Sequence, residues 1–138
     1  MSSRQRRYEK LNKIVGRLSR EISGGVAVIV EGVNDRIALR RIGLNGKISL
    51  FKSSRMKLED FVCQIDSQRA IVLTDFDKEG QELAGRLMQE LEHQGISVNN
   101  AIRKELAALI KPEIAKIEEL ASLIFRMRSE FSERHDLT

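Results

Sequence analysis

The sequence predicts an α/β fold in which helices cover both faces of a central, four-stranded parallel sheet. One observation is that short apolar runs alternate along the chain with segments whose apolar residues recur at helical spacing. A second is that the run 26–30 contains no polar residue, which is typical of a parallel strand buried on both faces. Strict alternation of strand and helix favours parallel strands joined by right-handed crossovers.

An amphipathic helix is expected before the sheet, over residues 4–22. Its apolar residues recur every three or four positions, and its other face is rich in Arg and Lys. Ser23-Gly24-Gly25 ends this helix, because glycine commonly follows the last helical turn. The basic face has two interpretations, an ordinary solvated surface or a patch that follows the phosphates of a nucleic acid.

The remaining elements follow in sequence order. The expected strands are 26–30, 47–51, 70–76 and 96–98, and the helices expected between them are 35–41, 56–65 and 79–94. Two helices follow, one over 101–110 and one that begins at Pro112, a residue common in the first helical turn, and ends near residue 131. Residues 1–138 are therefore interpreted as a single domain, with the helical extension 101–131 after the sheet.

Composition narrows the functional classes. A chain with 41% hydrophobic and 32% charged residues is typical of a soluble globular protein. The single cysteine, Cys63, excludes an internal disulfide and fits a reducing, cytoplasmic location. The charged N-terminus does not resemble a signal peptide, and no apolar run is long enough to span a membrane. The net charge of +4 permits nucleic-acid binding without requiring it.

Two aspartates at the end of an expected strand are the first candidate functional residues. Asp75 and Asp77 are two residues apart, so in an extended segment both side chains point to the same face. Two carboxylates so close repel unless a cation lies between them, and Mg²⁺ favours a pair of carboxylates together with phosphate oxygens. The alternative is that the aspartates cap the next helix. Gly80 is expected to allow the turn into that helix.

Glu31 is the second candidate, because it ends the first strand and precedes Gly32. If the first and third strands are neighbours, Glu31 lies near the two aspartates, and it then acts as a general acid or base. The alternative is a loop glutamate that caps the following helix. Asp35 has the same two interpretations, helix cap or second metal ligand.

Several basic residues are candidates for binding phosphate. Arg36 and Arg40 are four residues apart and therefore share one face of their helix. Lys78 follows the aspartate pair, and Arg6 and Arg7 belong to the basic face of the first helix. For each of these side chains the alternative is a solvated surface charge.

The acidic segments resemble a known family. Glu31-Gly32 after one strand and Asp75-Phe76-Asp77-Lys78-Glu79-Gly80 after a later one are similar to the motifs of the Toprim domain. That domain is shared by type IA and type II topoisomerases, bacterial primases and the 5S-rRNA maturation ribonuclease. The segment 31–41 is particularly similar to the maturation ribonuclease and to small stand-alone Toprim proteins typical of archaea.

The resemblance implies a fold and a role for each matched residue. The fold is a Rossmann-like three-layer sandwich, with a Toprim core over about residues 25–100. Asp75 and Asp77 correspond to the pair that coordinates Mg²⁺, Glu31 to the general acid or base, and Asp35 to a position that assists a metal in some members. The only tyrosine, Tyr8, precedes the core, so a covalent intermediate of the topoisomerase kind is not expected.

Three hypotheses about function remain open at this stage. The first is a Mg²⁺-dependent nuclease or nucleotidyl-transfer enzyme that acts on RNA or DNA. The second is a non-catalytic accessory module that binds metal and nucleic acid. The third is an interaction protein whose helical ends bind another protein or a second copy of the chain.

Overall fold

The central sheet has four parallel strands, as the sequence predicts, and their order is β2-β1-β3-β4. The computed structural model describes the backbone of residues 2–136 and the side chains of residues 2–131. The strands are β1 (Ala27–Val30), β2 (Ile48–Leu50), β3 (Arg69–Val72) and β4 (Ser97–Val98). β1 is a central strand, since Val28 lies opposite Ile48 of β2 and opposite Ile71 of β3.

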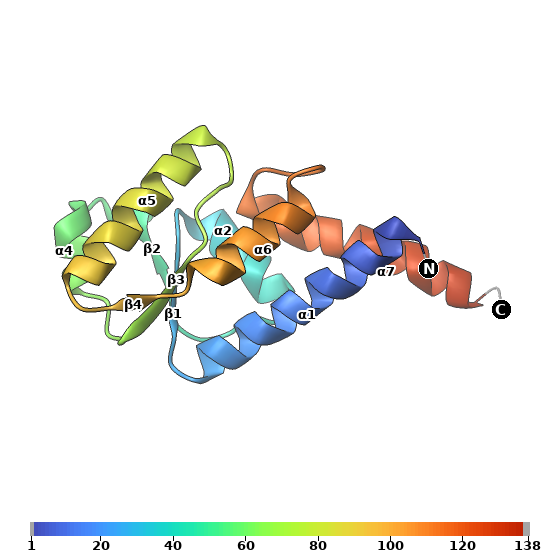
Figure 1. The fold of residues 1–138 in the computed structure, drawn as a ribbon, viewed down its shortest axis with the longest axis horizontal. Coiled ribbons are helices and arrows are strands. Elements are labelled where there is room, and N and C mark those ends of the chain that lie inside the picture. Colours follow the sequence, from blue (N-terminus) through green and yellow to red (C-terminus); the bar gives the residue numbers. More distant parts are fainter. Residues whose placement is uncertain (1, 137–138) are drawn as a thin grey trace.

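Helices lie on both faces of this sheet, so that three layers result (Figure 1). The helices are α1 (Ser3–Ser23), α2 (Val33–Arg41), α3 (Phe51–Ser54), α4 (Leu58–Cys63), α5 (Lys78–His93), α6 (Asn100–Ile110), the 3₁₀ helix η1 (Ile117–Glu119) and α7 (Leu120–Asp136). α4 and α5 cover one face, and α1, α2 and α6 cover the other. No helix in the part of the chain that the structure describes is long and apolar enough to cross a membrane.

The unbroken apolar run of β1 is explained by these two layers. Val28 and Val30 point into the cluster beneath α1 and α6, while Ile29 points into the cluster beneath α4 and α5. All three side chains are completely buried. Each such burial contributes about 1.5–3 kcal/mol to folding, so both faces of β1 have to be apolar.

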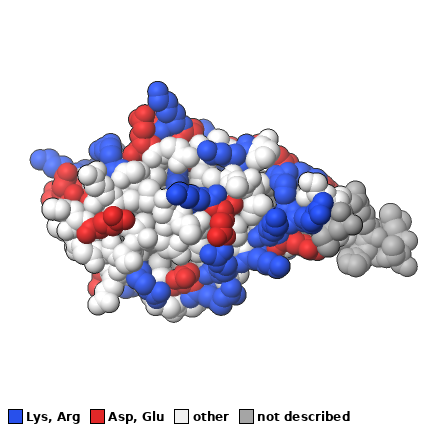
Figure 2. All heavy atoms as spheres, viewed as in Figure 1, with Lys and Arg blue, Asp and Glu red and all other residues white. Residues whose placement is uncertain are grey.

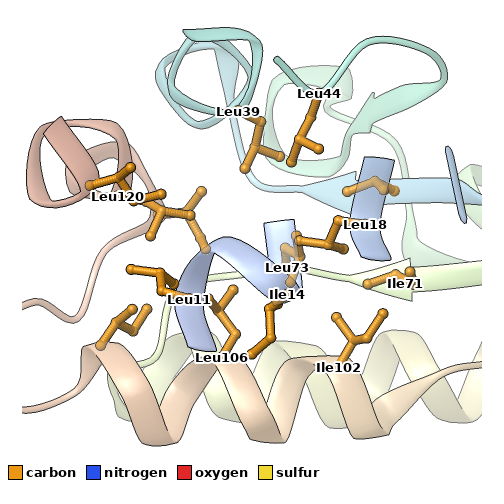
Figure 3. Packing of buried hydrophobic residues seen from close by; sticks show 14 of the residues in the cluster. Leu11, Ile14, Leu18, Leu39, Leu44, Ile71, Leu73, Ile102, Leu106 and Leu120 are labelled. Atoms are coloured by element: carbon orange, nitrogen blue, oxygen red, sulfur yellow. The ribbon is translucent and has the colours of Figure 1, made fainter. Parts of the chain in front are cut away.

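The apolar stripe of α1 is buried within the chain itself. Figure 3 shows Leu11, Ile14 and Leu18 in the core, with Leu106 of α6 on one side and Leu39 of α2 on the other. α1 and α7 run side by side away from the sheet, as the blue and red helices of Figure 1 show. The rings of Tyr8 and Phe131 are 5.2 Å apart between these helices. The apolar stripe of α1 is therefore buried against other helices of the same chain.

The expected strand 70–76 is too long. β3 ends at Val72, and the N–H of Leu73 makes the last bond towards β1, to the carbonyl of Ile29 at 2.7 Å. Beyond it the chain turns, and the N–H of Phe76 donates to the carbonyl of Ala115 at 2.7 Å. We call residues 73–77 the Asp75 loop. The bond from Phe76 to Ala115 ties this loop to a segment that is distant in sequence, which no local pattern reveals.

Pro112 does not start the last helix, contrary to the sequence prediction. It lies in a turn after α6, and a non-helical segment leads from there to η1 and then to α7, which begins at Leu120. The physical reason is that residues 115–117 leave the helical path to bond the Asp75 loop. Other elements differ less, and α2 begins at Val33 rather than at Asp35.

Candidate functional site

The site lies where two neighbouring strands end. Glu31 directly follows β1, and Asp75 lies three residues beyond the end of β3. β1 continues into α2 on one face of the sheet, whereas β3 continues into α5 on the other face. In open α/β sheets such a reversal opens a crevice at the carboxyl ends of the strands, where ligands bind. The structure therefore brings together the two acidic segments that the sequence singles out.

Glu31 connects the ends of three strands. Its side chain is buried, and Oε2 accepts a hydrogen bond from the Asp75 N–H at 2.8 Å. Its Oε1 forms an ion pair with Nζ of Lys52 at 2.6 Å, and Lys52 follows β2. Glu31 is thus held in place by a side chain from one neighbouring strand end and by the backbone from the other.

Asp75 lies against Glu31 but has its own hydrogen bond. Its Oδ1 accepts from the N–H of Ile117 at 2.9 Å. Burial and, to a smaller extent, the negative charges of Glu31, Asp35 and Asp77 together raise the pKa of Asp75 to about 6, against the opposing effect of the Ile117 bond. The carboxylates are therefore close enough to repel one another.

Asp35 is buried at the start of α2. The N-cap of this helix is Gly32, and Oδ2 of Asp35 reaches back to accept the Gly32 N–H at 3.0 Å. Burial raises the pKa of Asp35, and the charge of Glu31 adds to the effect. Asp35 therefore has a capping role, although not as the N-cap residue, and lies beside the other carboxylates.

Asp77 is used differently from Asp75. It is the N-cap of α5, exposed to solvent, and its Oδ1 accepts the Gly80 N–H at 2.7 Å. The expectation that both aspartates end a strand on one face is wrong, because β3 ends at Val72. The capping interpretation applies to Asp77, whose charge nevertheless acts on Asp75.

Gly80 is required by a close approach of α5 to the Asp75 loop. A Cβ atom on Gly80 would lie 2.0 Å from the Asp75 carbonyl oxygen, which leaves no room for any side chain. The hydroxyl of Thr74 also donates to the Gly80 carbonyl, at 2.7 Å. Gly32 is under no such steric constraint, since a Cβ there would meet only Oγ of Ser53 at 3.5 Å.

Arg103 of α6 holds the Asp75 loop from behind, and the sequence analysis missed it. The side chain is buried and donates hydrogen bonds to the carbonyls of Thr74 at 2.8 Å and of Asp75 at 3.0 Å. It also lies over the ring of Phe76, 4.5 Å from its centroid. Burial lowers the pKa of Arg103 to about 10, so the guanidinium remains charged at neutral pH. The sequence did contain a sign of its burial, because Arg103 lies within the apolar stripe of α6.

Lys52 was also missed, although a signal existed. It follows the expected second strand, and in a parallel sheet the residues after neighbouring strands meet at one edge. Its side chain is half exposed and also contacts Oε1 of Glu79 at 3.3 Å. Pairing with Glu31, and less so with Glu79, raises the pKa of Lys52.

An open cleft of about 620 Å³ adjoins these groups. Its lining is Glu31, Gly32, Val33, Asn34, Asp35, Lys52, Ser53, Arg55, Asp75, Lys116 and Glu118. Four of these residues are acidic and three are basic. No three His, Cys, Asp or Glu side chains among those described are arranged to hold a metal ion by themselves. A cation in this cleft therefore needs water or substrate oxygens as well, which is the usual situation for Mg²⁺.

None of the predicted phosphate-binding residues lines this cleft. Arg36, Lys78 and Arg6 lie at other positions of the surface, partly or fully exposed. Arg40 donates to the carbonyl of Gly46 at 3.3 Å.

Arg7 is engaged within the chain, where it pairs with Glu113 at 2.9 Å. Figure 2 shows that Lys and Arg gather along the lower right of this face, where Figure 1 places α1, with acidic residues among them. No residue of α1 lines the cleft beside Glu31, Asp35 and Asp75.

Comparisons with known proteins agree with this geometry. The family model of the Toprim domain matches residues 25–101. A UPF0292 protein of Pyrococcus horikoshii is 38% identical over 126 residues, which cover 90% of this chain and 91% of the relative. One of Thermococcus sibiricus is 36% identical over 123 residues, with 88% and 94% covered. The solved structure of a protein from Aquifex aeolicus superposes with a TM-score of 0.64 at 27% identity, over 78% of this chain and 95% of that one.

Proposed function

The chain belongs to the Toprim domain family, and we propose on that basis that it is a Mg²⁺-dependent enzyme acting on phosphodiester bonds of nucleic acids. Nuclease and nucleotidyl-transfer chemistry are the two reaction types that the site supports. The observation that carries the proposal is the contact between Glu31 and Asp75. Oε2 of Glu31 accepts a hydrogen bond from the Asp75 N–H at 2.8 Å, at the point where the connections of the sheet reverse direction.

The charges of the site fit a divalent cation. Asp75 and Asp35 both have raised pKa values, which means that the ionised carboxylates are poorly compensated by the protein alone. Asp75 and Asp77 would hold the ion, with Asp35 beside them as a third carboxylate. When bound, Mg²⁺ supplies stabilisation of the negative charge that develops on phosphoryl oxygens.

Glu31 is the proposed general acid or base. Its carboxylate lies at the wall of the cleft, and the Asp75 N–H fixes its orientation. A proton acceptor has to be held within hydrogen-bond reach of the group that it deprotonates, and the two contacts of Glu31 provide that rigidity. Its neighbour Lys52 balances the charge of the carboxylate at 2.6 Å.

The exposed cations outside the cleft are proposed to position the nucleic acid. Arg36, Arg40, Lys78 and Arg6 are available for phosphate contacts that carry no sequence information. Arg7 contributes less, because its guanidinium already pairs with Glu113 and with the carbonyl of Leu109. Binding through such contacts weakens steeply as the salt concentration rises.

A direct test compares wild type with Asp75→Asn and Glu31→Gln in nuclease and nucleotidyl-transfer assays on RNA and DNA. Both variants are expected to lose about 100-fold or more of the activity. Glu82→Gln, on the exposed surface of α5, is the matched control and is expected to retain it. Activity that survives both substitutions contradicts the proposal. Salt-sensitive binding that needs no metal and leads to no turnover favours the accessory module instead.

A further inference from the structure

Both oxygens of the Glu31 carboxylate already have partners within the chain. Oε1 is 2.6 Å from Nζ of Lys52, and Oε2 accepts the Asp75 N–H at 2.8 Å. The positive charge that this buried carboxylate requires is therefore supplied by a lysine.

The position of Lys52 is fixed by Glu31 itself. The N–H of Lys52 donates to the Glu31 carbonyl at 2.9 Å, and the N–H of Ser53 donates to the same oxygen at 3.3 Å. The ammonium group is thus tethered within reach of the Glu31 carboxylate. A tethered partner competes with dissolved ions at a high effective concentration. A hydrated Mg²⁺ ion must also lose water to take its place, which it does reluctantly.

Asp75 differs in this respect. Its Oδ1 accepts only a backbone hydrogen bond, and Arg103 contacts its carbonyl rather than its carboxylate. Among the residues whose side chains are described, none forms an ion pair with the Asp75 carboxylate. Glu31 therefore already has a cation beside it, whereas the Asp75 carboxylate lacks one among the described side chains.

We propose that Lys52 takes the place of a second metal ion beside Glu31, so that the site binds a single divalent ion, on the Asp75 side. Lys52 lines the cleft, and its side chain is half exposed. It is therefore placed to contact a substrate phosphate in the cleft, and Asp75, which lines the same cleft, would hold the ion. This catalytic part of the inference rests on the proposed function, whereas the number of ions does not.

The experiment counts bound ions. Chelator-treated protein is titrated with Mn²⁺ by calorimetry for wild type, Lys52→Gln, Lys52→Arg and the exposed control Lys57→Gln. We expect one ion for wild type, Lys52→Arg and Lys57→Gln. Lys52→Gln is expected to gain a second site, which the double variant with Glu31→Gln loses again. Any other count for wild type, or a single ion for Lys52→Gln, overturns the inference.

Folding and turnover are measured on the same samples. Lys52→Gln removes the cation beside the buried Glu31 carboxylate, so the metal-free variant is expected to unfold at a lower temperature than wild type. If Lys52→Gln does not fold, Lys52→Met is counted in its place, and a single ion for that variant overturns the inference. On a nucleic-acid substrate at saturating Mn²⁺, Lys52→Gln is expected to lose about 100-fold of the turnover. Wild type without turnover refutes the proposed function, and the ion count still decides the role of Lys52.

Discussion

The two halves of the site are held in opposite ways. Glu31 is fixed from the front of the site, by the half-exposed Lys52 and one backbone N–H. Asp75 is fixed from behind, by the buried Arg103 and by the N–H of Ile117. The groups that hold Glu31 lie within the Toprim match at residues 25–101, whereas those that hold Asp75 lie beyond it. The family core thus supplies the carboxylates, and the C-terminal extension fixes the geometry of one of them.

Glu31 and Asp75 are held differently because β3 ends before Asp75, whereas Glu31 directly follows β1. Glu31 directly follows a strand with neighbours on both sides, so its backbone is already fixed. The Asp75 loop has left the sheet, and its carbonyls need donors from elsewhere. Arg103 provides several donors in one side chain, and burial makes their loss expensive. Substitutions behind Asp75 should therefore affect stability more than substitutions at Glu31.

Gly80→Ala is expected to have the largest effect. The new Cβ would meet the Asp75 carbonyl oxygen at 2.0 Å, and backbone atoms on both sides have to move. We expect destabilisation by about 3 kcal/mol, measured by urea unfolding. Gly85→Ala in the same helix is the control, since nothing lies within 4 Å of its Cβ. It is expected to stabilise α5 by up to about 1 kcal/mol, and equal stability of the two variants contradicts the argument.

Arg103→Leu is expected to cost slightly less, about 2–3 kcal/mol. The carbonyls of Val72, Thr74 and Asp75 lose a buried donor, while the aliphatic packing is largely kept. Mn²⁺ affinity is expected to fall as well, because the Asp75 loop loses its support. Lys104→Leu, at the exposed neighbouring position, should stay within about 0.5 kcal/mol of wild type. An unchanged midpoint for Arg103→Leu would show that α6 does not hold the loop.

The pKa of Asp75 predicts a pH effect in metal-free protein. The folded state binds this proton more tightly than the unfolded state, because the pKa rises from 3.8 to about 6 on folding. The resulting stability is present below about pH 4 and is lost as the pH rises through 6. After allowance for partial exposure, the difference is about 2 kcal/mol. Asp75→Asn retains an oxygen for Ile117 and should lack this part of the slope, as urea unfolding at several pH values measures.

Glu31→Gln is expected to change stability least, by about 1 kcal/mol. The amide oxygen still accepts the Asp75 N–H, and only the pair with the half-exposed Lys52 is lost. The variant should therefore fold normally even though the proposed catalytic group is gone. A loss comparable to that of Arg103→Leu would show that both halves of the site depend equally on buried polar contacts.

The sequence predicted the parts of the site that depend on local pattern. The run that forms β1, the glutamate after it and the aspartate near the end of β3 are each readable within a few residues. The sequence allowed Asp77 to be either a metal ligand or a helix cap. Which of the two applies depends on where β3 ends. Beyond that end the chain bonds a distant segment, from Phe76 to Ala115, which no nearby residue indicates.

The sequence by itself therefore determined the parallel sheet and, on the condition that the first and third strands are neighbours, the meeting of Glu31 with Asp75. The order of the strands came from the tertiary structure. Alternating apolar periods fix which segments are buried, and burial is a property that each segment carries locally. The tertiary structure alone decided that Lys52 pairs with Glu31, that Arg103 lies behind Asp75, and that Pro112 belongs to a turn. These outcomes depend on hydrogen-bond partners that are distant in sequence, and such partners are determined only when the chain is folded.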